Sequence, residues 1–283
     1  MDLILAAHGT RRPGGVAMIG DLAAQVGALL DRRVQVTFVD VLGPTPSEVL
    51  SRAAASGRPA VVVPAFLSRG YHVRSDLPAH VAASGHPNVI VTPALGPSGE
   101  IARIIADQLA QSGWRPGDSV ILAAAGTTDS RARADLHITA TTLSALTGAR
   151  VRLGFAATGD PHVDDAVADA RRNGAHRVAV ASYLLADGLF QQRLRDCGAD
   201  RVSQPLGTHP GLARLIANRF RRAAPGLVPP TARHASRRPS RRRTQPPHAL
   251  SNSVERDARP AVAAFLANVP AFLAKSHADA RHA

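Results

Sequence analysis

The sequence predicts an α/β protein with two similar doubly wound parallel-sheet domains, followed by a basic, disordered C-terminal tail. Two observations carry this prediction: an internal repeat with a spacing of 117 residues, and an alternation of short apolar strands with helical stretches in each copy. A length of 283 residues fits two domains of roughly 120 residues each plus an extension. The expected divisions are residues 1–115, 116–224 and 225–283.

The internal repeat is visible at three places, which follow one another in the same order in both copies. Each place is an apolar, strand-like run that leads into a turn. The matched pairs are Leu3–Thr10 with Val120–Thr127, Val34–Phe38 with Val151–Phe155, and Val61–Gly70 with Val178–Gly188. The third pair ends at a spacing of 118, which indicates one inserted residue. Three landmarks in one order make chance a poor explanation, so we expect the two halves to share a fold.

Each half begins with an apolar strand, a glycine-containing turn and a helix. Val16–Leu30 is such a helix, because its apolar residues recur at steps of three and four. The strands carry apolar residues on both faces, which favours a parallel sheet covered by helices on both sides. Ligands of such sheets bind at the carboxyl ends of the strands. The sequence therefore predicts a site at these strand ends.

Composition restricts the chemistry of that site. A single cysteine, Cys197, excludes an internal disulfide and any site built from several thiolates, so histidine and carboxylate are the ligands to expect for a transition metal. No apolar run suggests a membrane span. The opening Met1–Ala7 is apolar but short and has no basic segment before it, so we expect a strand instead of a signal peptide, and a cytoplasmic protein.

The net charge of +13 is concentrated in the tail, from Arg221 onward. Residues 224–260 are rich in Pro, Arg and Ser and contain no aromatic residue, so we expect them to be disordered. At most they suggest salt-dependent, sequence-independent binding of nucleic acid. Pro260–Lys275 is compatible with one short helix. The tail histidines are irregularly spaced, and we interpret them as solvated side chains.

Three polar residues follow strand ends in the first half: His8, Asp40 and His72. Taken singly, each is typical of an ordinary loop. The repeat changes this interpretation, because their counterparts in the second half are Ala125, Ala157 and Phe190, respectively. Residues needed only by the framework are expected in both copies. Two histidines and a carboxylate suit a borderline divalent ion such as Fe²⁺, Co²⁺ or Ni²⁺, with positions left open for exchange.

The chain resembles the class II chelatases, the family of the sirohydrochlorin cobaltochelatases and ferrochelatases. The resemblance spans roughly residues 1–222. It is carried by the first-strand pattern Leu-Ile-Leu-Ala-Ala-His8-Gly-Thr-Arg, by a Pro-Thr-Pro-Ser segment, and by Val-Val-Val-Pro-Ala-Phe-Leu-Ser-Arg-Gly-Tyr-His72-Val-Arg-Ser-Asp76-Leu-Pro.

The resemblance implies that His8 and His72 bind the metal and act in catalysis. Where the family has a glutamate, this chain has Asp40, which is one methylene shorter. Asp40 is therefore the third metal-binding candidate. The implied substrate is sirohydrochlorin, a tetrapyrrole with many carboxylates. Arginines beside the two histidine loops are candidates to bind them, namely Arg11, Arg12, Arg69 and Arg74. The chain looks like the fused form of the family, in which the second half walls the cleft, so we expect a monomer.

The identity of the metal is open at this point, because nitrogen and oxygen ligands accept iron and cobalt alike. We expect Fe²⁺, for sirohaem, and no permanent cofactor, the ion being a co-substrate. One alternative is a cobaltochelatase of cobalamin biosynthesis. Another is a carrier that binds metal or tetrapyrrole without catalysis.

Overall fold

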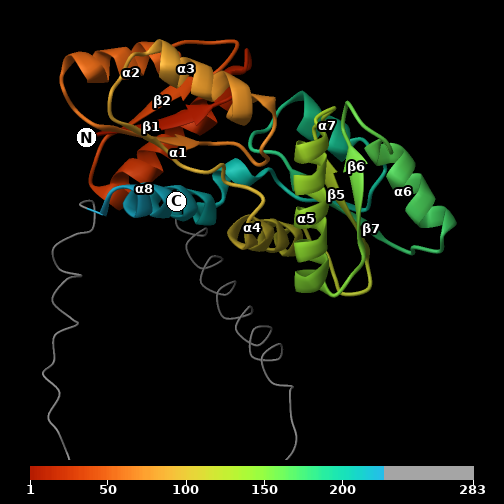
Figure 1. Ribbon diagram of the computed structural model, residues 1–283. Coiled ribbons are helices and arrows are strands. Elements are labelled where there is room, and N and C mark those ends of the chain that lie inside the picture. Colours follow the sequence, from red (N-terminus) through yellow and green to blue (C-terminus); the bar gives the residue numbers. More distant parts are fainter. Residues whose placement is uncertain (226–283) are drawn as a thin grey trace, which may run out of the picture. The chain divides into compact units, whose positions relative to one another are not determined.

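A computed structural model shows two four-stranded parallel sheets, and it describes residues 1–225 (Figure 1). In the first sheet the strands lie in the order β2-β1-β3-β4, and in the second in the order β6-β5-β7-β8. The bounds are β1 Asp2–Ala7, β2 Val34–Phe38, β3 Ala60–Pro64, β4 Val89–Val91, β5 Ser119–Ala124, β6 Val151–Phe155, β7 Val178–Tyr183 and β8 Arg201–Val202. The predicted fold class is confirmed. The predicted tail and its helix lie outside the described residues.

Strand register shows how closely the two sheets repeat. Leu3 pairs with Val34 in the first sheet, and Val120 pairs with Val151 in the second, both at the spacing of 117. Leu3 also pairs with Val61, whereas Val120 pairs with Ala179, so the spacing has already reached 118 at this strand. The extra residue therefore precedes β7, in the connection after α6 (Val163–Arg172), and does not lie within the strand segment itself.

The first sheet is covered on both faces, as its apolar strands require. Leu3, Leu5 and Ala7 pack in one cluster with α1 (Pro13–Leu30) and α8 (Pro210–Ala223). Ile4 and Ala6 belong to a second cluster, under α2 (Pro46–Ala55) and α3 (Leu77–Ala83). Thr45 and Glu48 form a capping box at the start of α2.

The second sheet is covered in the same way. Helix α4 (Gly99–Gln111) and helix α5 (Ser130–Thr147) lie on one face, while α6 and α7 (Leu189–Arg195) lie on the other. Asp129 caps α5 by accepting hydrogen bonds from the N–H groups of Arg131 and Ala132. A short 3₁₀ turn, η2 (Leu206–Thr208), precedes α8.

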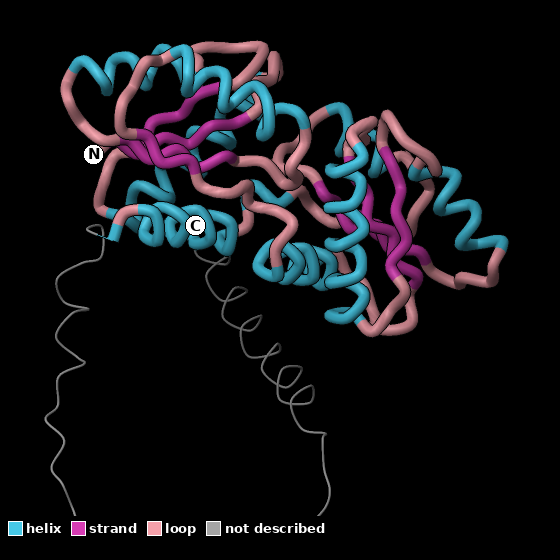
Figure 2. Tube along the Cα trace, in the orientation of Figure 1, coloured by secondary structure: helices cyan, strands magenta, loops and turns pink. Residues whose placement is uncertain are grey.

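The last helix of each half packs on the other half (Figure 2). Helix α4 contacts β7 and α5, and α8 contacts α1 and β3. One hydrophobic cluster consequently holds residues of both sheets together with Ile101 and Ile105 of α4 and Ile216 and Phe220 of α8. The two halves belong to one compact unit for this reason. The sequence repeat is thus not a division into separate packing units.

Helix α1 is long and apolar enough to cross a membrane by length and composition, with a mean hydropathy of 1.3 over 18 residues. Four of its large apolar side chains, Ile19, Leu22, Val26 and Leu30, are buried in the main hydrophobic cluster instead, while Leu29 is exposed. Its exposed positions are mostly small residues. The helix therefore has the pattern of a core helix, packed on the first sheet beside α8.

Candidate metal centre

His8 and His72 lie side by side at the carboxyl edge of the first sheet. Strands β1 and β3 are neighbours, His8 directly follows β1, and His72 opens a π-helical turn, η1 (His72–Asp76), after β3. The two ring centroids are 4.6 Å apart, and the rings are nearly perpendicular. His8 is exposed and His72 half-buried. The structure thus brings together two imidazoles that are 64 residues apart in the sequence.

Hydrogen bonds determine which ring nitrogen of each histidine is free. Nδ1 of His8 lies 2.7 Å from the carbonyl oxygen of Gly9, and Nδ1 of His72 lies 2.5 Å from a carboxylate oxygen of Asp76. Because both partners only accept, both Nδ1 atoms must carry the proton. In the neutral rings this leaves the Nε2 lone pairs for a ligand, which is the arrangement in which a carboxylate orients a metal-binding histidine.

Sequence reasoning missed the role of Asp76. The signal was present, since a four-residue step places two side chains on the same side of a helical turn. The ring of Phe66 adds a second restraint, because it stacks on His72 with centroids 6.2 Å apart.

Asp40 follows β2 at the same edge, as predicted, but its side chain is used locally. Its carboxylate accepts a hydrogen bond of 2.7 Å from the N–H of Val41, whose φ of 70° is unusual for a β-branched residue. Gly9 must be glycine here, because a Cβ would lie 2.0 Å from the Asp40 carbonyl oxygen. Within residues 1–225, no three His, Cys, Asp or Glu side chains are placed to hold one metal ion. Direct contact between Asp40 and metal stays a prediction.

Two of the four candidate arginines are available to a ligand. Arg11 and Arg12 are exposed at the start of α1. Arg12 lines a groove of about 450 Å³ together with Gly14 and Gly15 on one side and the segment from Asp187 to Gln192 on the other. The Arg195 guanidinium, with Arg12 as a further cation, holds the pKa of Asp187 below its usual value.

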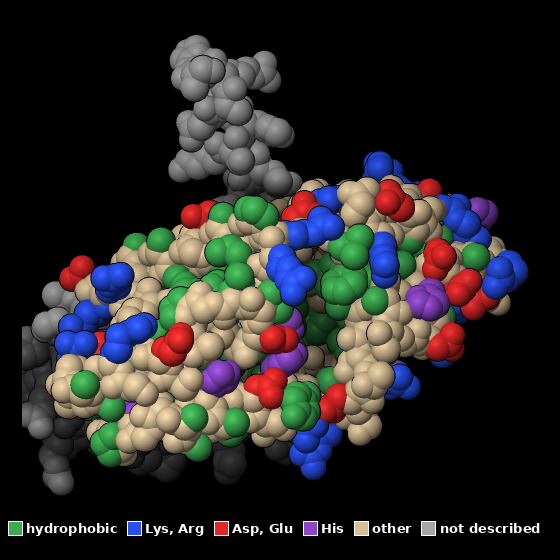
Figure 3. Space-filling view, turned by 90° about the horizontal axis from the view of Figure 1, so that it is seen from above, with side chains coloured by type: hydrophobic (Ala, Val, Ile, Leu, Met, Phe, Trp, Pro, Cys, Tyr) green, Lys and Arg blue, Asp and Glu red, His purple; other side chains and the backbone are tan. Residues whose placement is uncertain are grey.

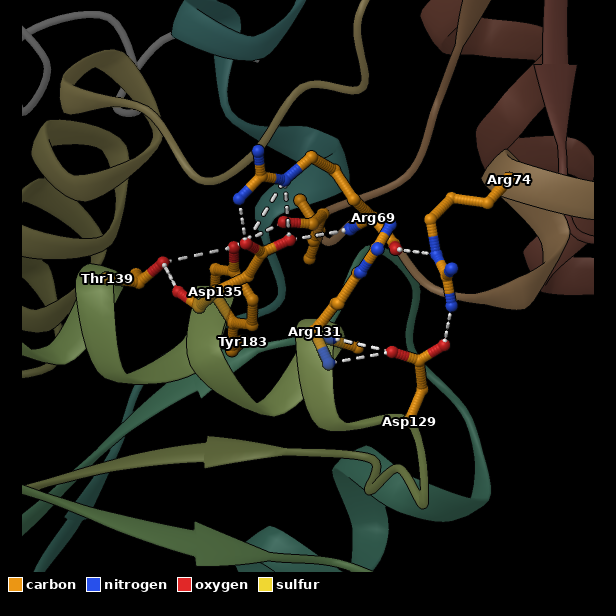
Figure 4. Close-up of polar contacts among 9 residues, drawn as sticks. Arg69, Arg74, Asp129, Arg131, Asp135, Thr139 and Tyr183 are labelled. Atoms are coloured by element: carbon orange, nitrogen blue, oxygen red, sulfur yellow. Dashed lines mark hydrogen bonds and ion pairs between the residues drawn. The ribbon is translucent and has the colours of Figure 1, made fainter.

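The other two arginines are already paired with carboxylates of the second half. Arg69 forms an ion pair with the buried Asp135, and Arg74 forms one with Asp129 (Figure 4). Their guanidinium groups join the halves in this structure, and binding of substrate carboxylates by these two arginines stays a prediction. No sequence pattern indicated these pairs, which span 66 and 55 residues.

The face that carries histidine side chains is hollowed, and hydrophobic side chains line the hollow (Figure 3). Several large apolar residues near the ends of the strands are exposed to an unusual degree. Tyr71, next to His72, is 62% exposed, and Leu189 and Phe190 at the start of α7 are 47% and 39% exposed. Such side chains suit the flat apolar face of a ligand.

Comparison with known proteins identifies the family. The family model described as CbiX matches residues 2–112 and again residues 119–223. A sirohydrochlorin cobaltochelatase of Methanopyrus kandleri is 36% identical over 78 residues, which are 27% of this chain and 54% of that protein. The chain spans about half the length of the curated relatives it matches.

Solved structures share the fold over most of the described chain. SirB from Bacillus subtilis with Fe³⁺ superposes with a TM-score of 0.69 at 19% identity, over 80% of this chain and 97% of that one. The sirohydrochlorin chelatase SirB from Bacillus subtilis subspecies spizizenii in complex with cobalt gives a TM-score of 0.63 at 18% identity, over 82% and 98%. At these identities the likeness shows the fold alone.

Proposed function

The chain belongs to the CbiX family, and we propose that it is a sirohydrochlorin chelatase, a lyase that inserts a divalent metal ion into the tetrapyrrole sirohydrochlorin. The observation that carries the proposal is the pair of histidines at adjacent strand ends, 4.6 Å apart, with both Nδ1 atoms engaged. The curated relatives, which are named sirohydrochlorin cobaltochelatases, support the substrate.

His8 and His72 hold the incoming ion through their Nε2 atoms. Two neutral nitrogen ligands bind a borderline divalent ion and leave its remaining positions to water, which the pyrrole nitrogens can replace. As the ion enters the macrocycle, two pyrrole N–H protons must leave. A histidine released from the ion can accept a proton on the freed nitrogen, so the same residues serve the metal and the proton. Asp76 keeps the His72 ring in the orientation this requires.

Side chains around the histidine pair bind the macrocycle. Exposed Tyr71, Leu189 and Phe190 offer apolar contact to its face. Arg11 and Arg12 bind its peripheral carboxylates by paired, charge-assisted hydrogen bonds. Both halves contribute these residues, and we propose that a single chain supplies the complete site.

The proposal also concerns which divalent ion is inserted. We propose that the two imidazoles load Fe²⁺ or Co²⁺, because both ions accept this donor set. A preference for Fe²⁺ stays our prediction, while the names of the curated relatives favour cobalt. Parallel assays with equal Fe²⁺ and Co²⁺ under anaerobic conditions decide it by the ratio of kcat/KM values.

The proposal is tested by following the absorption of sirohydrochlorin as purified protein and metal are added. The wild-type protein is expected to convert the spectrum to that of the metallated product. His8→Ala and His72→Ala should each remove this conversion without changing the far-ultraviolet circular dichroism. Full activity in both variants would contradict the assignment. Tight binding of sirohydrochlorin or metal without insertion would instead identify the chain as a carrier.

A further inference from the structure

We propose that the second half positions the metal-binding loop through a polar clamp, defined as Asp129, Asp135 and Tyr183. The clamp holds the segment Leu67–Arg74, which carries His72, and so fixes this ring relative to His8. The inference rests on the proposed function, since it concerns the same two histidines. It gives the second half a part in the metal centre beyond covering it.

Asp135 is the main contact of the clamp. Its carboxylate, on α5, is fully buried and accepts three kinds of hydrogen bond from one residue, Arg69 (Figure 4). The backbone N–H of Arg69 donates at 2.8 Å, its Nε at 3.1 Å to both carboxylate oxygens, and its Nη2 at 2.5 Å. The carboxylate raises the pKa of Arg69 through these bonds. Both the backbone and the side chain of the loop are therefore fixed at a point three residues before His72.

Tyr183 holds the loop at a second point. Its hydroxyl donates a hydrogen bond of 2.6 Å to the carbonyl oxygen of Leu67. The side chain is buried, and burial raises the pKa of Tyr183, so the hydroxyl stays a donor throughout the physiological range. Thr139 connects the two contacts, because its hydroxyl donates to the Asp135 carbonyl oxygen at 2.9 Å and lies 3.4 Å from the Tyr183 hydroxyl.

Asp129 holds the loop on the far side of His72. Its carboxylate pairs with Arg74 while it caps α5, and the N–H of Ala132 together with the Arg74 guanidinium keeps the pKa of Asp129 below its usual value. Arg74 in turn donates through Nε to the carbonyl oxygen of Arg69 at 3.1 Å. His72 thus lies between Arg69, which is bound to Asp135 of α5, and Arg74, which is bound to the N-cap residue of that helix.

The repeat shows that the clamp is not required by the fold. Asp129 and Asp135 correspond to Arg12 and Met18, and Tyr183 corresponds to Ala65. The reciprocal contact exists: a Cβ on Gly207 would lie 2.3 Å from the Met18 sulfur, and one on Gly188 would lie 3.6 Å from Cδ of Arg12. Between α1 and residues 185–192, no hydrogen bond is formed in the described part of the chain. The hydrogen-bonded contacts therefore occur on the side of the molecule where a metal ligand must be held, whereas on the reciprocal side Arg12 acts on Asp187 through its charge.

Preorganisation is the physical reason for the clamp. His72 lies in a half-buried loop, and ordering such a loop only when the ion arrives costs conformational entropy, which weakens binding. A ligand pair held in place by buried hydrogen bonds avoids that cost. Removing one clamp contact should consequently weaken metal binding without removing either ligand.

The test compares Co²⁺ binding by the full chain without tetrapyrrole, followed by its visible absorption, in the wild type, Asp135→Asn and Tyr183→Phe. A matched control is Asp200→Asn, whose carboxylate also accepts from a backbone N–H, that of Val178 at 2.8 Å, and from an arginine, Arg171 at 3.3 Å. It lies at the other end of β7, away from the loop. Thermal unfolding is measured for all four proteins.

We expect Co²⁺ to bind about tenfold more weakly to Asp135→Asn, and severalfold more weakly to Tyr183→Phe. In the insertion assay, KM for the metal should rise while KM for sirohydrochlorin stays unchanged. Asp200→Asn should lower thermal stability only. Unchanged Co²⁺ affinity in a folded Asp135→Asn and in Tyr183→Phe would overturn the inference. Wild-type protein that binds Co²⁺ but inserts no metal would overturn the proposed function alone, and wild-type protein that binds no Co²⁺ would overturn both.

Discussion

The two halves of this chain share a framework down to single hydrogen bonds, yet only the first carries the histidine pair. The N–H of Phe38 donates to the Pro44 carbonyl oxygen at 3.0 Å, and the N–H of Phe155 donates to that of Pro161 at 3.1 Å. Comparing the halves therefore distinguishes the residues of the shared framework from those of the site. Positions that both copies keep serve the fold, and we propose that His8 and His72, which the second copy replaces by Ala125 and Phe190, serve the chemistry.

The largest loss of stability is expected where backbone atoms of the shared framework leave no room for a side chain. Gly9 and Gly126 occupy corresponding turns of the two halves. A Cβ on Gly9 would lie 2.0 Å from the Asp40 carbonyl oxygen, and one on Gly126 would lie 2.1 Å from the Thr158 carbonyl oxygen. Gly9→Ala and Gly126→Ala should each lower the free energy of unfolding by about 3 kcal/mol or more, because backbone must shift. Urea unfolding measures this. Equal stability of either variant and the wild type would show that the turn is not shared framework.

A second prediction concerns the orientation of His72. Asp76→Asn replaces a carboxylate by an amide that can still accept a hydrogen bond from Nδ1, but without charge. We expect metal affinity to fall by about 10- to 100-fold, with both ligands still present. Co²⁺ titration measures it. An affinity within twofold of the wild type would mean that the carboxylate does not orient the ring.

The third prediction reverses the difference between the halves. Ala125→His with Phe190→His gives the second half both histidines of the first. We expect a second Co²⁺ equivalent, bound at least about tenfold more weakly than the first, because Leu194 stands where Asp76 orients the ring. Equilibrium dialysis counts the bound ions. A stoichiometry unchanged from the wild type would show that the retained framework does not bring these positions together.

The smallest effect is a dependence of stability on pH. His209 caps α8, its Nδ1 accepting from the N–H of Gly211 at 3.1 Å, and burial holds the pKa of His209 below its ordinary value of 6.5. The neutral ring is thus favoured in the folded protein, and this stability is present above pH 6.5 and is lost as the pH falls through the lowered folded pKa. Loss of a cap costs about 1 kcal/mol, or roughly 2–4 °C in Tm.

The matched control for this cap is His209→Asn, which retains a capping side chain that does not titrate. Its Tm should fall less than that of the wild type between pH 7.5 and pH 5.5. Parallel curves for the two proteins would rule out His209 as the origin of the dependence.

Much of this comparison was predictable from the sequence, because a repeat exposes which residues differ. The sheets, the strand ends and the pairing of His8 with His72 follow from local patterns and the parallel topology. The packing of α4 and α8 on the opposite halves could not be predicted, because periodicity shows which face of a helix is buried but not against which sheet. The ion pairs of Arg69 and Arg74 were missed for a related reason: a charged loop residue gives no sign of a partner 55 or 66 residues away.

The role of His8 and His72 in metal insertion is tested most directly by giving the first half the corresponding residues of the second. The double variant His8→Ala with His72→Phe removes the pair and leaves every framework contact of the repeat in place. Metal insertion into sirohydrochlorin is measured by absorption, together with Tm. We predict no insertion above the uncatalysed rate and a Tm close to that of the wild type. Insertion at the wild-type rate by this folded variant would contradict the account.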